Sequence, residues 1–123
     1  MFNNFTSSGK HMICDFKEIK NTDLLNNCYK LRSMLREICK IYEFQILDEL
    51  EHQFEPIGCS IIFMLSESHM SIHTFPEKAH ISFDIYTCRQ YDTNVPYDNL
   101  YSFIKRQLQA SNKSNYTIID RFF

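Results

Sequence analysis

Apolar residues recur at two different periods along the chain, and the period distinguishes helices from strands. Between residues 21 and 42 they fall at steps of three and four, which predicts a helix with one buried stripe formed by Leu24, Cys28, Leu31, Leu35, Ile38 and Tyr42. Asn21 or Thr22 is placed to cap its first turn. A second helix is predicted to open at Pro96, with a stripe formed by Leu100, Ile104 and Leu108.

Segments with strand character lie before, between and after these helices. Residues 81–86 alternate apolar and polar side chains, as a half-buried strand does, and residues 59–65 form the continuous apolar run of a buried strand. Further strands are predicted at residues 11–16, 44–54, 70–75 and 116–119, after a loose polar segment at residues 1–8. The only two glycines, Gly9 and Gly58, are expected where the backbone needs unusual freedom.

The order of these elements predicts an α+β fold, a two-layer sandwich in which a mostly antiparallel sheet carries two helices packed on one face. With 123 residues and no linker or repeat, residues 1–123 are expected to form a single domain. The other face of the sheet stays open unless a partner covers it. Because the chain holds 11 Phe and 7 Tyr, we expect a homodimer that covers part of this face.

Composition and charge narrow the range of partners. A hydrophobic content of 44% excludes a disordered chain. The net charge of −2, from 13 basic and 15 acidic residues, gives no reason to expect nucleic acid as a partner. No apolar run approaches the roughly 20 residues of a membrane span. The first residues also lack the pattern of a signal peptide, so the expected location is the cytoplasm.

Five cysteines are present, an odd number, and no pair has C-x-x-C spacing. A disulfide framework and a zinc site are therefore not expected. Four of the cysteines are expected to be small buried hydrophobic residues: Cys14, Cys28, Cys39 and Cys59.

Polar side chains with chemical potential gather between residues 58 and 88. His69 and His73 lie four residues apart, and on a strand positions four apart can share one face. A metal site would need a third ligand, such as Glu67, Glu77 or His80, and the spacing matches no established zinc pattern, so no metal is predicted. Ser68 lacks the G-x-S-x-G context of a hydrolase nucleophile.

Five short segments stand in a fixed order along the chain. They read GKH (9–11), HQFEPIGCS (52–60), ESH (67–69), IHTFPE (72–77) and DIYTC (84–88). Together they resemble the S-adenosylmethionine decarboxylase proenzymes of the short prokaryotic type, in which similar segments have the same spacing. Two positions depart from that pattern: Phe75 stands where the family usually has Trp, and Arg89 stands where it usually has Gly.

The resemblance implies a proenzyme that makes its own cofactor. The hydroxyl of Ser68 would attack the carbonyl of Glu67, and the chain would separate into a β chain, 1–67, and an α chain, 68–123. Residue 68 would become a pyruvoyl group, with no other cofactor and no metal. Two residues match the positions that the family uses for processing: Ser60 and, as the base, His73. A neutral imidazole suits proton removal near physiological pH.

The resemblance also assigns roles in turnover. The pyruvoyl carbonyl would form a Schiff base with the amine of the substrate and act as the electron sink. Cys88 matches the proton donor, and a free thiol is largely protonated at neutral pH. Phe54 matches an aromatic residue that stacks on adenine from a site at the dimer interface. Glu67 and Glu77 are candidates to bind the ribose or the charge of the substrate.

The implied activity is that of a carboxy-lyase. It converts S-adenosylmethionine to S-adenosylmethioninamine, the aminopropyl donor of spermidine biosynthesis. One alternative keeps the pyruvoyl chemistry but uses arginine or ornithine, and the departure at Arg89 keeps this alternative open. Another is a non-catalytic regulatory paralogue, which predicts the loss of Ser68, His73 or Cys88, whereas all three are present.

Overall fold

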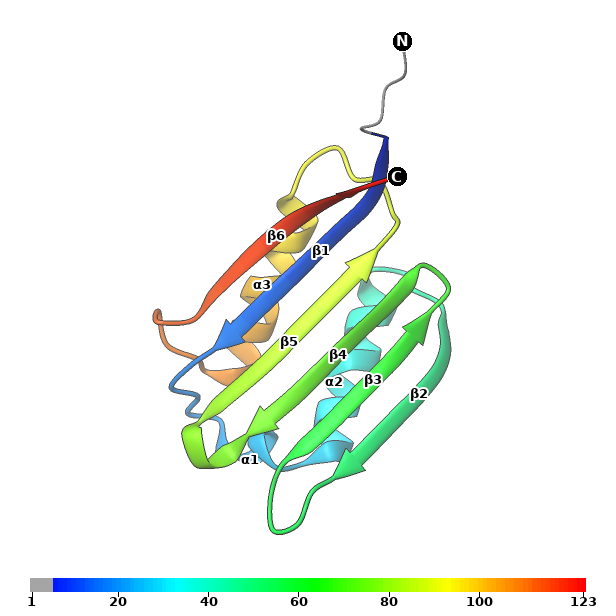
Figure 1. Ribbon diagram of the computed structural model, residues 1–123. Helices are drawn as coiled ribbons and strands as arrows, with labels where there is room; N and C mark the ends of the chain where they lie inside the picture. The colour runs from blue at the N-terminus through cyan, green and yellow to red at the C-terminus, as the bar shows by residue number, and fades with distance from the viewer. Residues whose placement is uncertain (1–5) are drawn as a thin grey trace.

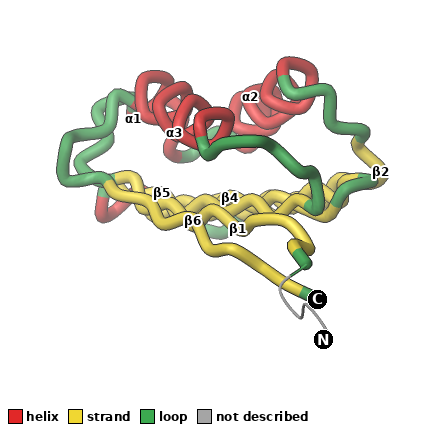
Figure 2. The backbone as a smooth tube through the Cα atoms, turned by 90° about the horizontal axis from the view of Figure 1, so that it is seen from above, coloured by secondary structure: helices red, strands yellow, loops and turns green. Residues whose placement is uncertain are grey.

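Residues 6–123 are described in the computed structural model, where they form one antiparallel sheet with helices on one face (Figure 1). In chain order the elements are β1 (Ser7–Phe16), α1 (Thr22–Leu25), α2 (Cys28–Ile41), β2 (Ile46–Gln53), β3 (Cys59–Leu65), β4 (Ser68–Phe75), the 3-10 helix η1 (Pro76–Lys78), β5 (His80–Thr87), α3 (Val95–Leu108) and β6 (Asn115–Phe122). The strand order is β2-β3-β4-β5-β1-β6. Every neighbouring pair is antiparallel. The predicted two-layer α+β sandwich is confirmed, with α2 and α3 on the same face (Figure 2).

Strand alternation decides which side chains meet the helices. On β5, Ile81, Phe83 and Ile85 are buried, whereas Ser82 and Asp84 between them belong to the open face. The stripe of α2 covers this core, and its Leu31, Leu35 and Ile38 are fully buried. Burying one such side chain contributes about 1.5–3 kcal/mol, so this packing fixes which face of each strand points outward.

The helix predicted from residue 21 is interrupted at Asn26 and Asn27, where α1 ends and α2 begins. Asn26 Oδ1 accepts the backbone N–H of Gly58 at 2.8 Å, and Asn27 Oδ1 caps α2 by accepting the N–H of Lys30 at 3.0 Å. Asn21 precedes α1, but its side chain makes no capping hydrogen bond. The apolar spacing continues across the break, so the sequence pattern did not reveal that the helix is interrupted there.

Several strands are longer than the sequence predicted, because pairing with a neighbour extends them. β1 begins at Ser7, so the predicted loose segment is wrong for residues 7–8, while residues 1–5 lie outside the described part of the chain. The expectation for the glycines is confirmed, since Gly9 and Gly58 both have a φ of +111°. A Cβ on Gly9 would lie 1.9 Å from the carbonyl oxygen of Thr87, so β1 passes very close to the end of β5.

Cys28 and Cys59 form a disulfide, which corrects the expectation that no disulfide is present, although both residues are buried as predicted. The bond joins the first residue of α2 to the first residue of β3, across a sequence separation of 31. Sequence spacing did not reveal it, because the fold brings the two Cα atoms to 5.9 Å. Cys14 and Cys39 are buried free thiols, as predicted, and burial raises the pKa of Cys39 to about 11.

The helices of the described residues are short, the longest having 14 residues. None between residues 6 and 123 has both the length and the apolar character that crossing a membrane requires.

Candidate active site

The predicted cleavage site lies in the tight turn between β3 and β4. Leu65 ends β3, Ser68 begins β4, and these two residues pair in the ladder. Ser68 has a φ of +136°, a conformation that residues with a side chain rarely adopt. Such conformations cost roughly 1–3 kcal/mol and gather at functional sites. The peptide bond predicted to be cut therefore leads into a strained residue.

The carbonyl of that peptide bond is already polarised by a backbone donor. The N–H of Cys88 donates to the carbonyl oxygen of Glu67 at 3.0 Å. The pairing of Ser68 with Thr87, the last residue of β5, brings Cys88 beside the turn. A donor at this distance stabilises the negative charge that would develop on the oxygen during attack by a nucleophile. The thiol of Cys88 is free and its residue is exposed.

Arg89 holds the side chain of Glu67. Its Nε donates to Oε2 at 2.8 Å, and its Nη2 donates to Oε1. The hydrogen bonds from Arg89 lower the pKa of Glu67 below its usual value, although partial burial acts in the opposite direction. Both carboxylate oxygens are thus engaged, and a substrate contact at Glu67 has to compete with this ion pair.

A polar cluster spans β1, β4 and β5 on the open face. Asp84 Oδ2 lies 2.7 Å from His11 Nε2 and 3.3 Å from His69 Nε2, and Ser71 donates to Oδ1. Burial raises the pKa of Asp84, but the hydrogen bonds from Ser71 and the histidines outweigh it, so the pKa lies below its usual value. His69 therefore groups with His11 and Asp84, not with the third ligands considered from the sequence. Because these three residues bring possible ligand atoms within 4.8 Å of one another, the absence of a metal stays a prediction.

The other predicted site residues gather around a cavity of about 380 Å³. Ser60 Oγ lies 2.7 Å from His73 Nδ1, in a pair formed across the β3–β4 ladder. Phe54 and Glu77 line the same cavity, and Phe54 is 46% exposed. The structure thus brings together the two residues predicted for processing and two of those predicted for substrate binding.

The cleavage turn at Ser68 and the Ser60–His73 pair at the cavity do not meet within one copy of the chain. Ser68 and His73 lie five residues apart on the same strand. At about 3.3 Å per residue, that separation is roughly 16 Å. Proton transfer needs hydrogen-bond distance or one bridging water. His73 therefore does not reach residue 68 of its own chain.

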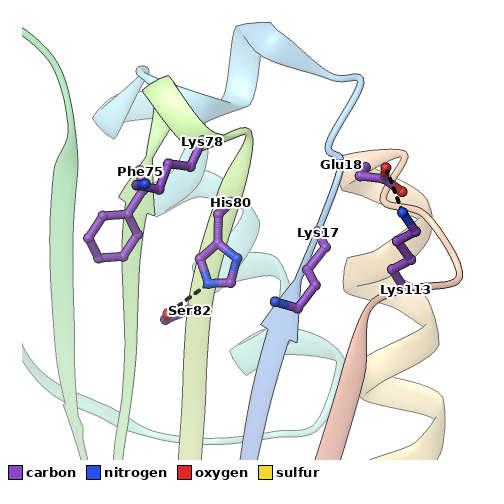
Figure 3. Close-up of a pocket in the computed structure, with 7 residues that line it drawn as sticks. All are labelled: Lys17, Glu18, Phe75, Lys78, His80, Ser82 and Lys113. Carbon is purple, nitrogen blue, oxygen red and sulfur yellow. Dashed lines mark hydrogen bonds and ion pairs between the residues drawn. The ribbon is translucent and has the colours of Figure 1, made fainter.

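A larger hollow, of about 610 Å³, borders this cavity at Phe75 (Figure 3). Its lining consists of Lys17, Glu18, Phe75, Lys78, His80, Ser82 and Lys113. His80 Nε2 lies 3.2 Å from Ser82 Oγ, and Lys113 pairs with Glu18. None of the residues predicted for catalysis lines this hollow, so its size does not mark it as the active site.

The comparison with known proteins decides the family. A family model described as S-adenosylmethionine decarboxylase matches residues 10–122. The chain belongs to the S-adenosylmethionine decarboxylase family. This membership confirms the resemblance that the five sequence segments indicated.

Individual members of the S-adenosylmethionine decarboxylase family agree with this assignment. The S-adenosylmethionine decarboxylase proenzyme of Bacillus velezensis is 32% identical over 115 residues, covering 89% of this chain and 83% of that protein. The proenzyme of Clostridium botulinum is 38% identical over 81 residues, covering 66% and 69%. The crystal structure of the adenosylmethionine decarboxylase from Aquifex aeolicus matches with a TM-score of 0.81 at 25% identity, covering 96% of this chain and 93% of that chain.

Sequence reasoning missed the contacts of Arg89 and gave no role to His11 or Asp84. Arg89 was visible only as a departure from the family pattern. Strand alternation placed Asp84 on the polar face, and the GKH segment marked His11. Neither signal could show that the two side chains meet across β1 and β5.

Proposed function

We propose that this chain is the proenzyme of an S-adenosylmethionine decarboxylase, a lyase that cuts itself between Glu67 and Ser68. The observation that carries the proposal is the cleavage turn, where the strained Ser68 follows a carbonyl held on the Cys88 N–H. Family membership supports S-adenosylmethionine as the substrate, in preference to arginine or ornithine. The presence of Ser68, His73 and Cys88 argues against a regulatory paralogue.

Self-cleavage needs only the chain and water. The Oγ of Ser68 attacks the carbonyl carbon of Glu67, and the acyl group passes from nitrogen to oxygen, which replaces the amide with an ester. The Cys88 N–H stabilises the negative charge on the carbonyl oxygen. A base then removes the α-proton of residue 68, and the electron pair of that C–H bond forms the Cα–Cβ double bond. The Cβ–Oγ bond breaks, and the main-chain carboxylate of Glu67, now the end of fragment 1–67, leaves. Tautomerisation and hydrolysis, which consumes water and releases ammonia, yield the pyruvoyl group.

The surroundings of residue 68 suit this group. Residue 68 stands at the start of β4, where the ladder with Thr87 fixes its backbone. The carbonyl of a pyruvoyl group takes up the amine of a substrate and accepts the electron pair that CO₂ leaves behind. The exposed Cys88 follows Thr87 directly, so the proposed proton donor lies just past the end of the adjacent strand.

A homodimer would bring the cleavage turn at Ser68 of one copy close to the Ser60–His73 pair of the other. Two open sheet faces can meet across a twofold axis that runs between them and across the strands. This operation places the Ser68 end of one copy against the His73 end of the other. Each Ser60–His73 pair would then serve the cleavage turn of its partner. The cavity with Phe54 and Glu77 would receive the adenosine part of the substrate.

Exposed apolar side chains on the open face support this association. Leu50, Ile62 and Met64 are 67%, 46% and 57% exposed, and Leu50 pairs with Ile62 across β2 and β3. A neighbouring group of exposed apolar residues of this kind marks an association surface. The second copy both covers this surface and completes the site.

The substitution Ser68→Ala tests the proposed function. Wild-type protein should separate into fragments 1–67 and 68–123 on a denaturing gel, with a pyruvoyl group instead of a serine at the start of the second fragment by mass. Ser68→Ala should stay one inactive chain, because no hydroxyl attacks Glu67. Ser66→Ala, in the same turn, is the matched control and should be cut normally. A folded wild-type chain that persists uncut would overturn the proposal.

A further inference from the structure

We propose that Arg89 is a positioning residue for self-cleavage, which holds the Glu67 side chain so that the scissile carbonyl stays on the Cys88 N–H. The inference rests on the proposed function and adds a residue to it. It comes from the contacts that surround the guanidinium group.

The first set of contacts fixes Glu67. Two nitrogens of Arg89 donate to the two carboxylate oxygens, so the pair is bidentate. A bidentate pair fixes orientation as well as distance. The side chains of Arg89 and Glu67 are only 25% and 27% exposed, which limits competition from water for their hydrogen bonds. The carboxylate is therefore held in one position relative to Arg89.

The second set of contacts fixes Arg89 itself. Its Nη1 donates to the carbonyl of Tyr42 at 2.5 Å, and its Nη2 donates to the carbonyl of Glu43 at 3.2 Å. These carbonyls follow the end of α2, where a positive charge is favoured. The guanidinium also lies 4.4 Å from the ring centroid of Phe44. Arg89 is thus anchored to the body of the protein independently of Glu67.

The backbone connects this anchor to the scissile bond. Cys88 and Arg89 are consecutive, and the N–H of Arg89 donates to Thr87 Oγ1 at 3.2 Å, which tightens the end of β5. One short segment therefore holds Glu67 twice, at its carbonyl oxygen and at its carboxylate. Without the second contact the turn has more freedom to rotate the carbonyl away. A misplacement of about 1 Å can cost about 10²-fold in rate.

A double-mutant cycle on the precursor tests the role of Arg89. Newly translated chains are followed by intact mass as they convert to fragments. Arg89→Gln should slow conversion about tenfold. If Arg89 acts through Glu67, the double variant Glu67→Gln/Arg89→Gln should be no slower than Glu67→Gln alone, within about twofold. If Arg89 only stabilised the carbonyls of Tyr42 and Glu43, Arg89→Gln would slow conversion by the same factor in the wild-type and Glu67→Gln chains.

Two further variants serve as controls. Arg36 and Glu49 form a matched pair away from the cleavage turn, with Nη2 to Oε1 at 2.8 Å. Arg36→Gln should leave the rate of conversion unchanged. Arg89→Lys keeps the charge but loses the planar fork, so its rate should lie between those of wild type and Arg89→Gln. Thermal unfolding of Ser68→Ala, with and without Arg89→Gln, reports the stability of the uncut chain.

The outcomes separate this inference from the proposed function. An uncut wild-type chain overturns both. If the wild-type chain is cut and Arg89→Gln is cut equally fast, only the role of Arg89 is overturned. The same holds if Arg89→Gln slows cleavage by the same factor with and without the Glu67→Gln substitution. If Ser68→Ala/Arg89→Gln does not fold, Arg89→Lys decides the question, and a wild-type rate in that variant overturns the inference.

Discussion

Cys88 serves the proposed site with two different groups. Its backbone N–H lies 3.0 Å from the carbonyl oxygen of Glu67, and its thiol is free on an exposed residue. A side-chain substitution removes the thiol but leaves the N–H in place. Cutting and turnover are therefore separable at this one position.

For this reason Cys88→Ala should still be cut but should turn over poorly. Loss of a positioned proton donor costs about 10²–10⁴-fold, or leads to protonation at the wrong atom. The measurement is CO₂ release by the processed protein, with the products identified by mass. Gln90→Ala, an exposed position nearby, is the control. Full activity with the normal product would remove Cys88 from the proposed role.

The sequence could predict which residue types carry the chemistry, but not which of them meet. The ESH and DIYTC segments marked Glu67, Ser68 and Cys88 because they matched a family pattern. The contact between Glu67 and Arg89 depends on how β4 pairs with β5, and one sequence does not show that pairing. The strand predicted at residues 70–75 began after Ser68, so the sequence analysis did not place Ser68 and His73 on one strand, as β4 does.

Among the elements, the close approach of β1 to the end of its neighbour β5 has a direct bearing on the cleavage turn. A Cβ on Gly9 would lie 1.9 Å from Thr87 O and 2.7 Å from the Cα of Cys88. The backbone of β1 thus packs against the same segment that holds Glu67. The cleavage turn depends on a close approach between two strands that are far apart in the sequence.

Gly9→Ala should therefore both destabilise the fold and slow cleavage. The added methyl group pushes the end of β5 away from β1, at an expected cost of about 2–4 kcal/mol. Thermal unfolding in the Ser68→Ala background measures the first effect, and the rate of conversion to fragments measures the second. Gly58→Ala is a matched control, because Gly58 has the same φ of +111° but its nearest neighbouring atom lies at 3.5 Å. If Gly9→Ala and Gly58→Ala lost the same stability and the same conversion rate, the clash at Thr87 would have no effect beyond backbone strain.

Element types were more predictable than element boundaries. Alternation gave the correct face for residues 81–86, since burial of Ile81, Phe83 and Ile85 follows directly from a period of two. The break between α1 and α2 was not visible in the sequence, because its Asn26 side chain accepts a hydrogen bond from the N–H of Gly58, just before β3, which only the folded chain brings near. The Cys28–Cys59 disulfide was missed for the same reason, since it joins elements that only the folded chain brings together.

At the scale of the whole molecule, a site completed by a second copy can be tested by complementation. Ser68→Ala chains keep His73 but cannot be cut, and His73→Ala chains keep Ser68 but lack the proposed base. Neither should be processed alone. When the two are co-expressed, the His73→Ala chains should be cut, because a partner supplies the imidazole. Intact mass, with a tag on one chain, measures which chain is cut.

The control for complementation pairs His73→Ala with Ser68→Ala/His73→Ala, a mixture that lacks His73 entirely. It should give no fragments. Cutting of His73→Ala alone at the wild-type rate would contradict the role of His73. Absence of cutting in the first mixture, although mixed dimers form, would contradict the arrangement in which each copy serves the other.

The order of strands indicates how the two fragments would hold together after the proposed cleavage. Fragment 1–67 would contain β1, β2 and β3, and fragment 68–123 would contain β4, β5 and β6. In the sheet β1 of the first fragment lies between β5 and β6 of the second, and β4 and β5 of the second lie between β3 and β1 of the first (Figure 1). Pulling them apart would require opening the seams β3–β4, β5–β1 and β1–β6 together. Cleavage would therefore create a new chain terminus while the two interlocked fragments stay within one sheet.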